Sequence, residues 1–208
     1  MIIDLGIMDY EESYRTQKEF VRLRKLGEIE DSFILAEHYP VFTIGRTGSI
    51  DNLLENESAL SEKGIKVLRV DRGGDITFHG PGQLVIYPVI DLKKRGSDLH
   101  RYLRDLEQFI IGLLKEFAVF GERAPGKTGV WVHGKKIASI GIAASNWITF
   151  HGLCLNVSPD VSFFSMINPC GMKGVEMTSV SGVLGRTVTM NAVKEKAIGL
   201  INANAVLA

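Results

Sequence analysis

The fold is constrained most by one long helical stripe that stands between groups of strand-like segments. Over residues 99–117 apolar side chains recur at three-and-four spacing, which is typical of an amphipathic helix of about five turns. Segments rich in β-branched residues and bounded by turn residues lie on both sides of it. The strands predicted in this way cover residues 32–38, 41–45, 66–72, 82–92, 129–134, 136–145 and 148–157.

Two more helices are predicted near the ends of the chain. Asp9 is placed to cap a first helix, with Glu12 three residues on as in a capping box. Thr189 is placed to cap a final helix, whose apolar face is Val193, Ala197, Leu200 and Ile201. Strands in runs, with helices at the start, middle and end, predict an α/β (α+β) fold with a mixed sheet covered by helices. The 208 residues fit a single domain, since we find no repeat or linker.

The composition argues against several classes of protein. Lys plus Arg and Asp plus Glu both number 24, so no basic field indicates nucleic-acid binding. We find no apolar run of membrane-spanning length and no secretory signal at the start, so no membrane partner is expected. Two cysteines do not make a disulfide framework, and a reducing cytoplasm is the predicted location.

Residues 72–83, RGGDITFHGPGQ, have the composition of a loop that cradles a ligand. Glycines let backbone N–H groups approach a bound molecule closely. Arg72 offers a planar fork of donors, and His79 can carry a proton near neutral pH. Composition alone leaves open an ordinary Gly-Pro loop between strands.

Residues 121–128, GERAPGKT, match the phosphate-loop pattern letter for letter. A phosphate loop follows a strand and opens a helix, whereas here the long helix precedes the motif and a β-rich segment follows it. The apolar run ending at Asp91, the candidate magnesium-binding partner, is interrupted by Pro88. Nucleotide hydrolysis is therefore the less favoured reading.

His151 and Cys154 have H-x-x-C spacing, and Cys170 and His79 could complete four metal ligands. The sequence holds no second close pair, and Cys154 alternates with apolar positions along a predicted strand. We therefore expect Cys154 to be a small buried side chain and predict no metal site.

Cys170 has a different setting, between Pro169 and Gly171 in a segment without strand or helix periodicity. A partly accessible loop position is predicted for it. The residues themselves leave two readings open, a reactive nucleophile or an inert loop cysteine.

Four segments in order resemble the lipoyl(octanoyl) transferase family: residues 72–83, GKKIASIG at 134–141, HGLCLNV at 151–157 and NPCG at 168–171. The resemblance extends from about residue 45 to residue 182. It implies the fold shared by biotin and lipoate ligases, and the first step of protein lipoylation as the activity. Octanoyl-acyl carrier protein would be the donor. The acceptors would be lysines in lipoyl domains of 2-oxoacid dehydrogenase E2 subunits and of glycine cleavage H protein.

The resemblance also implies the site. Cys170 matches the cysteine that forms the acyl thioester, and Lys136 matches the lysine that lowers its pKa. Lys135 would point to the opposite face of the strand. The implied acyl and substrate pocket consists of Arg72, Gly73, Gly74, Asp75, Ile76, Thr77, Phe78, His79, Ser139, Ile140, Gly141, Gly152, Leu153 and Cys154. No cofactor is expected beyond the phosphopantetheine of the carrier protein.

Three alternatives remain. An ATP-dependent lipoate ligase would share the fold but would activate its acid as an adenylate, without a nucleophilic cysteine. An amidotransferase that moves octanoyl between proteins would use a cysteine in another motif context. A non-catalytic binder of lipoyl domains would have no need of Cys170 and Lys136.

Overall fold

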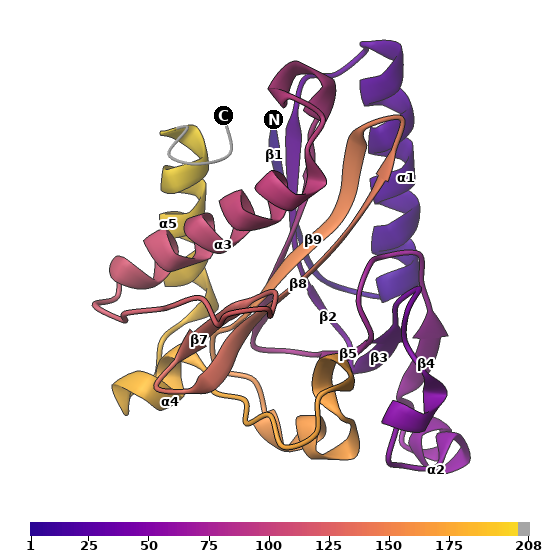
Figure 1. Ribbon diagram of the computed structural model, residues 1–208, viewed down its shortest axis with the longest axis vertical. Coiled ribbons are helices and arrows are strands. Elements are labelled where there is room, and N and C mark those ends of the chain that lie inside the picture. Colours follow the sequence, from indigo (N-terminus) through magenta and orange to yellow (C-terminus); the bar gives the residue numbers. More distant parts are fainter. Residues whose placement is uncertain (204–208) are drawn as a thin grey trace.

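Two β-sheets form the framework of the computed structural model, which describes residues 1–203 (Figure 1). The larger sheet is mixed, with β1 and β2 parallel and its other neighbouring strands antiparallel. Its strand order is β1 (Ile2–Met8), β2 (Ser32–His38), β6 (Gln83–Val89), β9 (Ile148–Asn156), β8 (Lys135–Ser145) and β7 (Val130–Val132). The smaller sheet has the order β4 (Lys66–Arg69), β3 (Val41–Ile44) and β5 (Ile76–His79).

Helices cover both faces of the larger sheet. Helix α1 (Tyr10–Leu26) packs on one face, and α3 (Leu99–Lys115) and α5 (Met190–Asn202) pack on the other (Figure 1). Short helices α2 (Glu57–Glu62) and α4 (Val180–Leu184) and the 3₁₀ turns η1 (Ile50–Asn52), η2 (Leu92–Arg95), η3 (Val161–Met166) and η4 (Pro169–Gly171) lie in the connections. The predicted mixed sheet covered by helices is confirmed.

The predicted helix caps and the helical stripe are also confirmed. The Asp9 carboxylate accepts from the backbone N–H of Glu11, and the Thr189 hydroxyl accepts from that of Ala192. Most of the stripe on α3 is buried, although Leu99 at its start is 37% exposed. Burying one apolar face of α3 against the sheet stabilises it far more than its intrinsic helix propensity does.

Three strand predictions need correction. Residues 2–8 form β1, which we did not predict and which pairs in parallel with β2. The strand predicted over 66–72 ends at Arg69, and Ile76–His79, predicted as part of a loop, is strand β5. Both β4 and β5 have four residues and depend on pairing with β3, a long-range contact that local periodicity does not reveal.

Candidate active site

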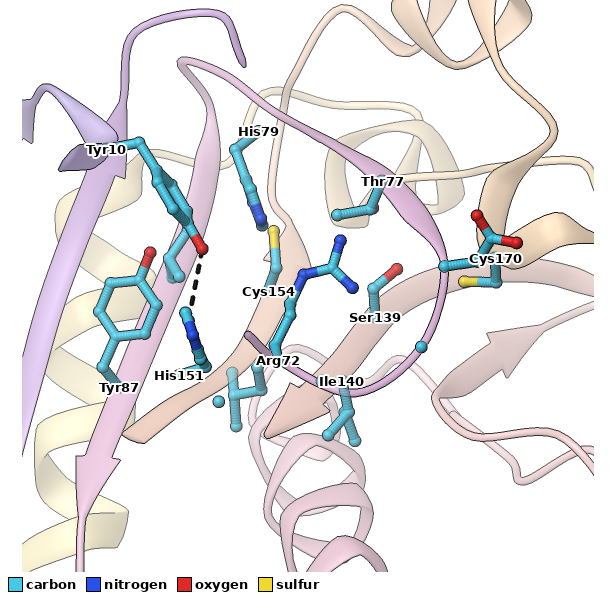
Figure 2. A pocket seen from close by; sticks show the side chains of 16 residues that line it. Tyr10, Arg72, Thr77, His79, Tyr87, Ser139, Ile140, His151, Cys154 and Cys170 are labelled. Carbon is cyan, nitrogen blue, oxygen red and sulfur yellow. Dashed lines mark hydrogen bonds between the residues drawn. The ribbon is translucent and has the colours of Figure 1, made fainter. Parts of the chain in front are cut away.

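A narrow pocket of about 50 Å³ lies where β5, β6, β8 and β9 approach the glycine-rich segment 72–75 and η4 (Figure 2). Most of the residues expected at a substrate site line it, although they come from four separate parts of the sequence. These are Arg72, Gly74, Asp75, Thr77, His79, Ser139, Ile140, Gly141, Gly152, Leu153, Cys154 and Cys170.

The structure places three expected pocket residues elsewhere. Strand alternation along β5 turns Thr77 and His79 into the pocket, while Ile76 and Phe78 pack in the separate apolar cluster beneath the smaller sheet. Gly73 acts through its backbone, because its N–H donates to the carbonyl of Ile142 at 2.8 Å and so joins the loop to β8.

Cys170 stands in η4 with a left-handed backbone, φ 56° and ψ 26°, which is uncommon for a residue with a side chain. The surrounding contacts hold this conformation in place. The backbone N–H of Asn168 donates to the carbonyl of Asn52 at 2.8 Å, and the Asn52 side chain donates to Asp75 Oδ2 at 2.7 Å. Gly171 lies so close to that carboxylate that a Cβ there would be 2.6 Å from it. The partly exposed thiol of Cys170 is therefore fixed beside the start of β5.

Lys136 lies beside this thiol. Its side chain is 1% exposed, and Nζ donates to Cys170 Sγ at 2.9 Å. Within residues 1–203 the Lys136 side chain makes no ion pair with a carboxylate, and its Nζ lies 5.1 Å from the centroid of the Trp131 ring. Lys135 points the other way, as expected, and pairs with Glu176 at 2.7 Å on the surface.

Glu107, which the sequence did not single out, supports this arrangement from α3. Its fully buried carboxylate accepts from the backbone N–H of Gly129 at 3.0 Å and from Arg123 and Arg104 at 2.9 and 2.7 Å. Gly129, at φ 130°, packs so closely on Lys136 that a Cβ would lie 2.8 Å from Cε.

Arg123 belongs to GERAPGKT, which runs between α3 and β7 and opens no helix, so the context of a phosphate loop is missing as predicted.

Arg72 brings a buried cation to the middle of the pocket. It donates to the carbonyl and hydroxyl of Thr43 at 2.7 and 2.8 Å and to the carbonyl of Gly73 at 3.0 Å. Its Nε is buried without a partner among the described residues, and burial lowers the pKa of Arg72. The pocket therefore offers an unused donor to a polar group of a ligand.

Tyr10, Tyr87 and His151, none of them predicted at the site, line the end of the pocket away from Cys170 (Figure 2). Tyr10 is the first residue of α1, and its oxygen lies 3.3 Å from His151 Nδ1. His151 Nε2 lies 2.7 Å from Asp71 Oδ1. The two contacts join residues 141 and 80 positions apart, so no local sequence pattern reveals this series of hydrogen bonds.

The protonation of these groups follows from their surroundings. The hydrogen bond from His151 lowers the pKa of Asp71 to about 2, so the carboxylate accepts from His151 Nε2–H. Burial lowers the pKa of His151 and raises that of Tyr10, so the Tyr10 hydroxyl donates to His151 Nδ1. Burial also holds the pKa of His79 well below its usual range, and its Nδ1 has no partner among the described residues.

Cys154 is also on the pocket wall, but its surroundings differ from those of Cys170. The side chain is 5% exposed and packs with apolar residues of the face covered by α1. Burial raises the pKa of Cys154, which favours the neutral thiol.

Within residues 1–203 we find no group of three or more His, Cys, Asp or Glu side chains arranged to hold a metal ion. No helix in that range is both long and apolar enough to cross a bilayer.

A protein-family model and several known proteins are similar to this chain over most of its length. Residues 9–201 match the family model described as the lipoyl protein ligase A/B catalytic domain. An octanoyltransferase from Geobacter metallireducens is 46% identical over 199 residues, 96% of this chain and 90% of the relative. One from Rubrobacter xylanophilus is 47% identical over 93% of this chain and 87% of the relative.

Solved structures support the fold. A putative lipoate protein ligase from T. acidophilum matches with a TM-score of 0.69 at 13% identity, over 95% of this chain and 81% of its own. The biotin protein ligase from Aquifex aeolicus, in complex with biotin and ATP, matches with a TM-score of 0.59 at 15% identity. The match covers 98% of this chain and 69% of the ligase chain. The fold alone is thus shared with ATP-using ligases, and the closer sequence relatives are acyltransferases. The chain belongs to the lipoyl protein ligase A/B catalytic-domain family, among its octanoyltransferases, and is an acyltransferase.

Proposed function

We propose that this acyltransferase moves an octanoyl group from octanoyl-acyl carrier protein to the target lysine of a lipoyl domain through an S-octanoyl intermediate on Cys170. The observation that carries the proposal is the 2.9 Å contact between Lys136 Nζ and Cys170 Sγ at one end of the pocket. A buried ammonium with no carboxylate partner among the described residues stabilises a thiolate, which is the nucleophilic form of cysteine.

The reaction has two half-steps. In the first, the Cys170 thiolate attacks the donor thioester carbonyl, the new C–S bond forms, and the phosphopantetheine sulfur leaves and takes a proton. In the second, the lysine amine attacks the enzyme thioester, an amide forms, the amine loses a proton, and Cys170 returns as thiol or thiolate. The conversion of a thioester into an amide lowers the free energy, so the transfer needs no nucleotide.

The pocket suits an acyl chain because glycines and apolar side chains form much of its walls. Gly141 and Gly152 lie on neighbouring strands, and Val85, Ile140 and Leu153 add apolar surface. Burial of each methylene would contribute about 0.8 kcal/mol. The pocket is narrow in this structure, so an entering chain would have to displace its side chains.

The acceptors we propose are lipoyl domains of 2-oxoacid dehydrogenase E2 subunits and of glycine cleavage H protein, and the cytoplasm is the proposed location. The motifs and the relatives named octanoyltransferases support this assignment. It requires no cofactor other than the phosphopantetheine that the carrier protein brings.

Intact-mass measurement after mixing with octanoyl-acyl carrier protein tests the first half-step. We expect one octanoyl adduct, removed by neutral hydroxylamine, in the wild type and in Cys154→Ala, and none in Cys170→Ala. Cys154→Ala is the matched control, because it removes the other thiol of the same pocket. An adduct that persists in Cys170→Ala would place the nucleophile elsewhere. Transfer that proceeds only with ATP would instead indicate a ligase.

A further inference from the structure

Tyr10 separates the acyl pocket from a second, larger space. The groove beyond it has a volume of about 500 Å³, against about 50 Å³ for the pocket, and among residues 1–203 Tyr10 alone lines both. The other residues of the groove are Glu11, Tyr14, Arg46, Leu68, Arg69, Val70 and Asp71. Leu68 and Val70 give the groove an apolar stretch next to Tyr10.

Tyr10 also lies at the end of the pocket opposite the thiol. In Figure 2, Cys170 is on one side, Tyr10 is on the other, and Arg72, Ser139 and Cys154 lie between them. An acyl chain attached to Cys170 and lying within the pocket therefore points its methyl end toward the Tyr10 ring.

The Tyr10 ring is held firmly. It is 4% exposed and stacks on His79, with ring centroids 5.7 Å apart and planes 18° apart. The His38 ring meets it in an edge-type contact, with centroids 5.2 Å apart and planes 62° apart. Its hydroxyl donates to His151, which in turn donates to Asp71. Contacts on several sides leave the ring little freedom to turn away when a longer chain enters.

We propose that Tyr10 sets the length of the acyl chain, as the wall that stops the chain before it reaches the groove. The inference rests on the proposed function, since it requires the acyl group to be carried on Cys170. Replacing the ring with a small side chain would join the pocket to the groove, where Leu68 and Val70 would contact the extra methylenes of a longer chain.

The test measures initial rates of acylation of Cys170 by intact mass, with carrier protein loaded with C6, C8, C10, C12 or C14 acyl groups. Wild type should prefer C8 to C12. Tyr10→Ala should raise the C12 to C8 rate ratio by about tenfold or more, within the range expected for apolar pockets. Tyr10→Phe keeps the ring and should keep the preference for C8. Leu68→Ala, a change in the groove but not in the pocket, is the matched control and should leave the ratio unchanged while the Tyr10 ring is present.

Tyr10→Leu gives the same comparison if Tyr10→Ala does not fold, and should raise the ratio in the same direction. An adduct that forms on Cys170 with the same C12 to C8 ratio in wild type and the folded small-residue variant would overturn the role of Tyr10 and leave the proposed function standing. A wild type that never acylates Cys170 would overturn both.

Discussion

Lys136 and Cys170 are 34 positions apart in the chain, yet two local features bring Nζ and Sγ into contact. Strand alternation turns Lys136 inward while Lys135 faces solvent, and the left-handed turn at Cys170 presents the thiol beside β8. At about 4 Å and an effective dielectric near 20, a unit charge pair gains roughly 4 kcal/mol. The buried cation therefore favours the form of the sulfur that attacks a thioester.

Removing the charge of Lys136 should therefore slow alkylation of Cys170. In Lys136→Ala we expect the rate at pH 7 to fall by about tenfold, since 1.4 kcal/mol corresponds to a factor of ten, and to recover at high pH where the thiol ionises unaided. Lys136→Arg should keep fast alkylation if the larger guanidinium fits. Lys135→Ala, the exposed neighbour, should behave as wild type. A pH profile unchanged by Lys136→Ala would mean that another group activates Cys170.

At the scale of secondary-structure elements, α3 does more than cover the sheet. Glu107 on its buried face ties the helix to Gly129, and Gly129 closes over Lys136. The two arginines that share the carboxylate are 48% and 38% exposed, so part of their attraction is screened by water. The buried hydrogen bond to the Gly129 backbone is the contact that fixes the wall of the site.

Glu107→Ala should lower the free energy of unfolding by about 1–3 kcal/mol, the cost of leaving a buried donor without a partner. It should also slow Cys170 alkylation at pH 7, because the wall beside Lys136 loosens. Glu116→Gln, at the residue that caps the end of α3, breaks the surface pair with Lys196 of α5 and should change stability by less than about 1 kcal/mol. Denaturant unfolding and alkylation kinetics check both effects, and wild-type values for Glu107→Ala would contradict them.

The junction between β1 and β2 gives the protein a pH-dependent stability. Burial lowers the pKa of His38 to about 4, and the neutral ring donates from Nδ1 to the Met8 carbonyl and accepts the Tyr87 hydroxyl at Nε2. Between about pH 6.5 and pH 4 the unfolded chain binds a proton that the folded chain does not. The free energy of unfolding therefore falls as pH drops through this window.

From pH 7 to pH 5 the share of His38 in this loss should be about 2 kcal/mol. His38→Gln should consequently lose less stability over that interval than wild type does, although it starts lower because the hydrogen bonds to Met8 and Tyr87 change. Denaturant titrations at the two pH values measure the difference, and equal losses in wild type and His38→Gln would contradict it.

For the whole molecule, the sequence predicts what depends on local periodicity and misses what depends on long-range pairing. The α3 stripe, most of the strands and the caps at Asp9 and Thr189 follow from local patterns. Strands β1 and β5 do not, because each is defined by a partner strand.

The same limit applies to the pocket. Ordered motifs pointed to most of its lining, but Tyr10 sits at a helix start and His151 in a buried strand, and nothing near either residue indicates the other. Glu107 reads in sequence as one more charged helix residue, since its contact with Gly129 spans 22 positions.

If the proposed function holds, acylated Cys170 is an intermediate on the path to the lipoyl domain. To test it, the wild-type protein is loaded with octanoyl groups, freed of carrier protein and mixed with a lipoyl domain without ATP. Quenched samples are then weighed intact over time. The adduct should leave Cys170 at the rate at which an octanoyl amide appears on one lysine of the lipoyl domain. An isolated adduct that does not react, while octanoyl-carrier protein still supports transfer in the same mixture, would contradict it.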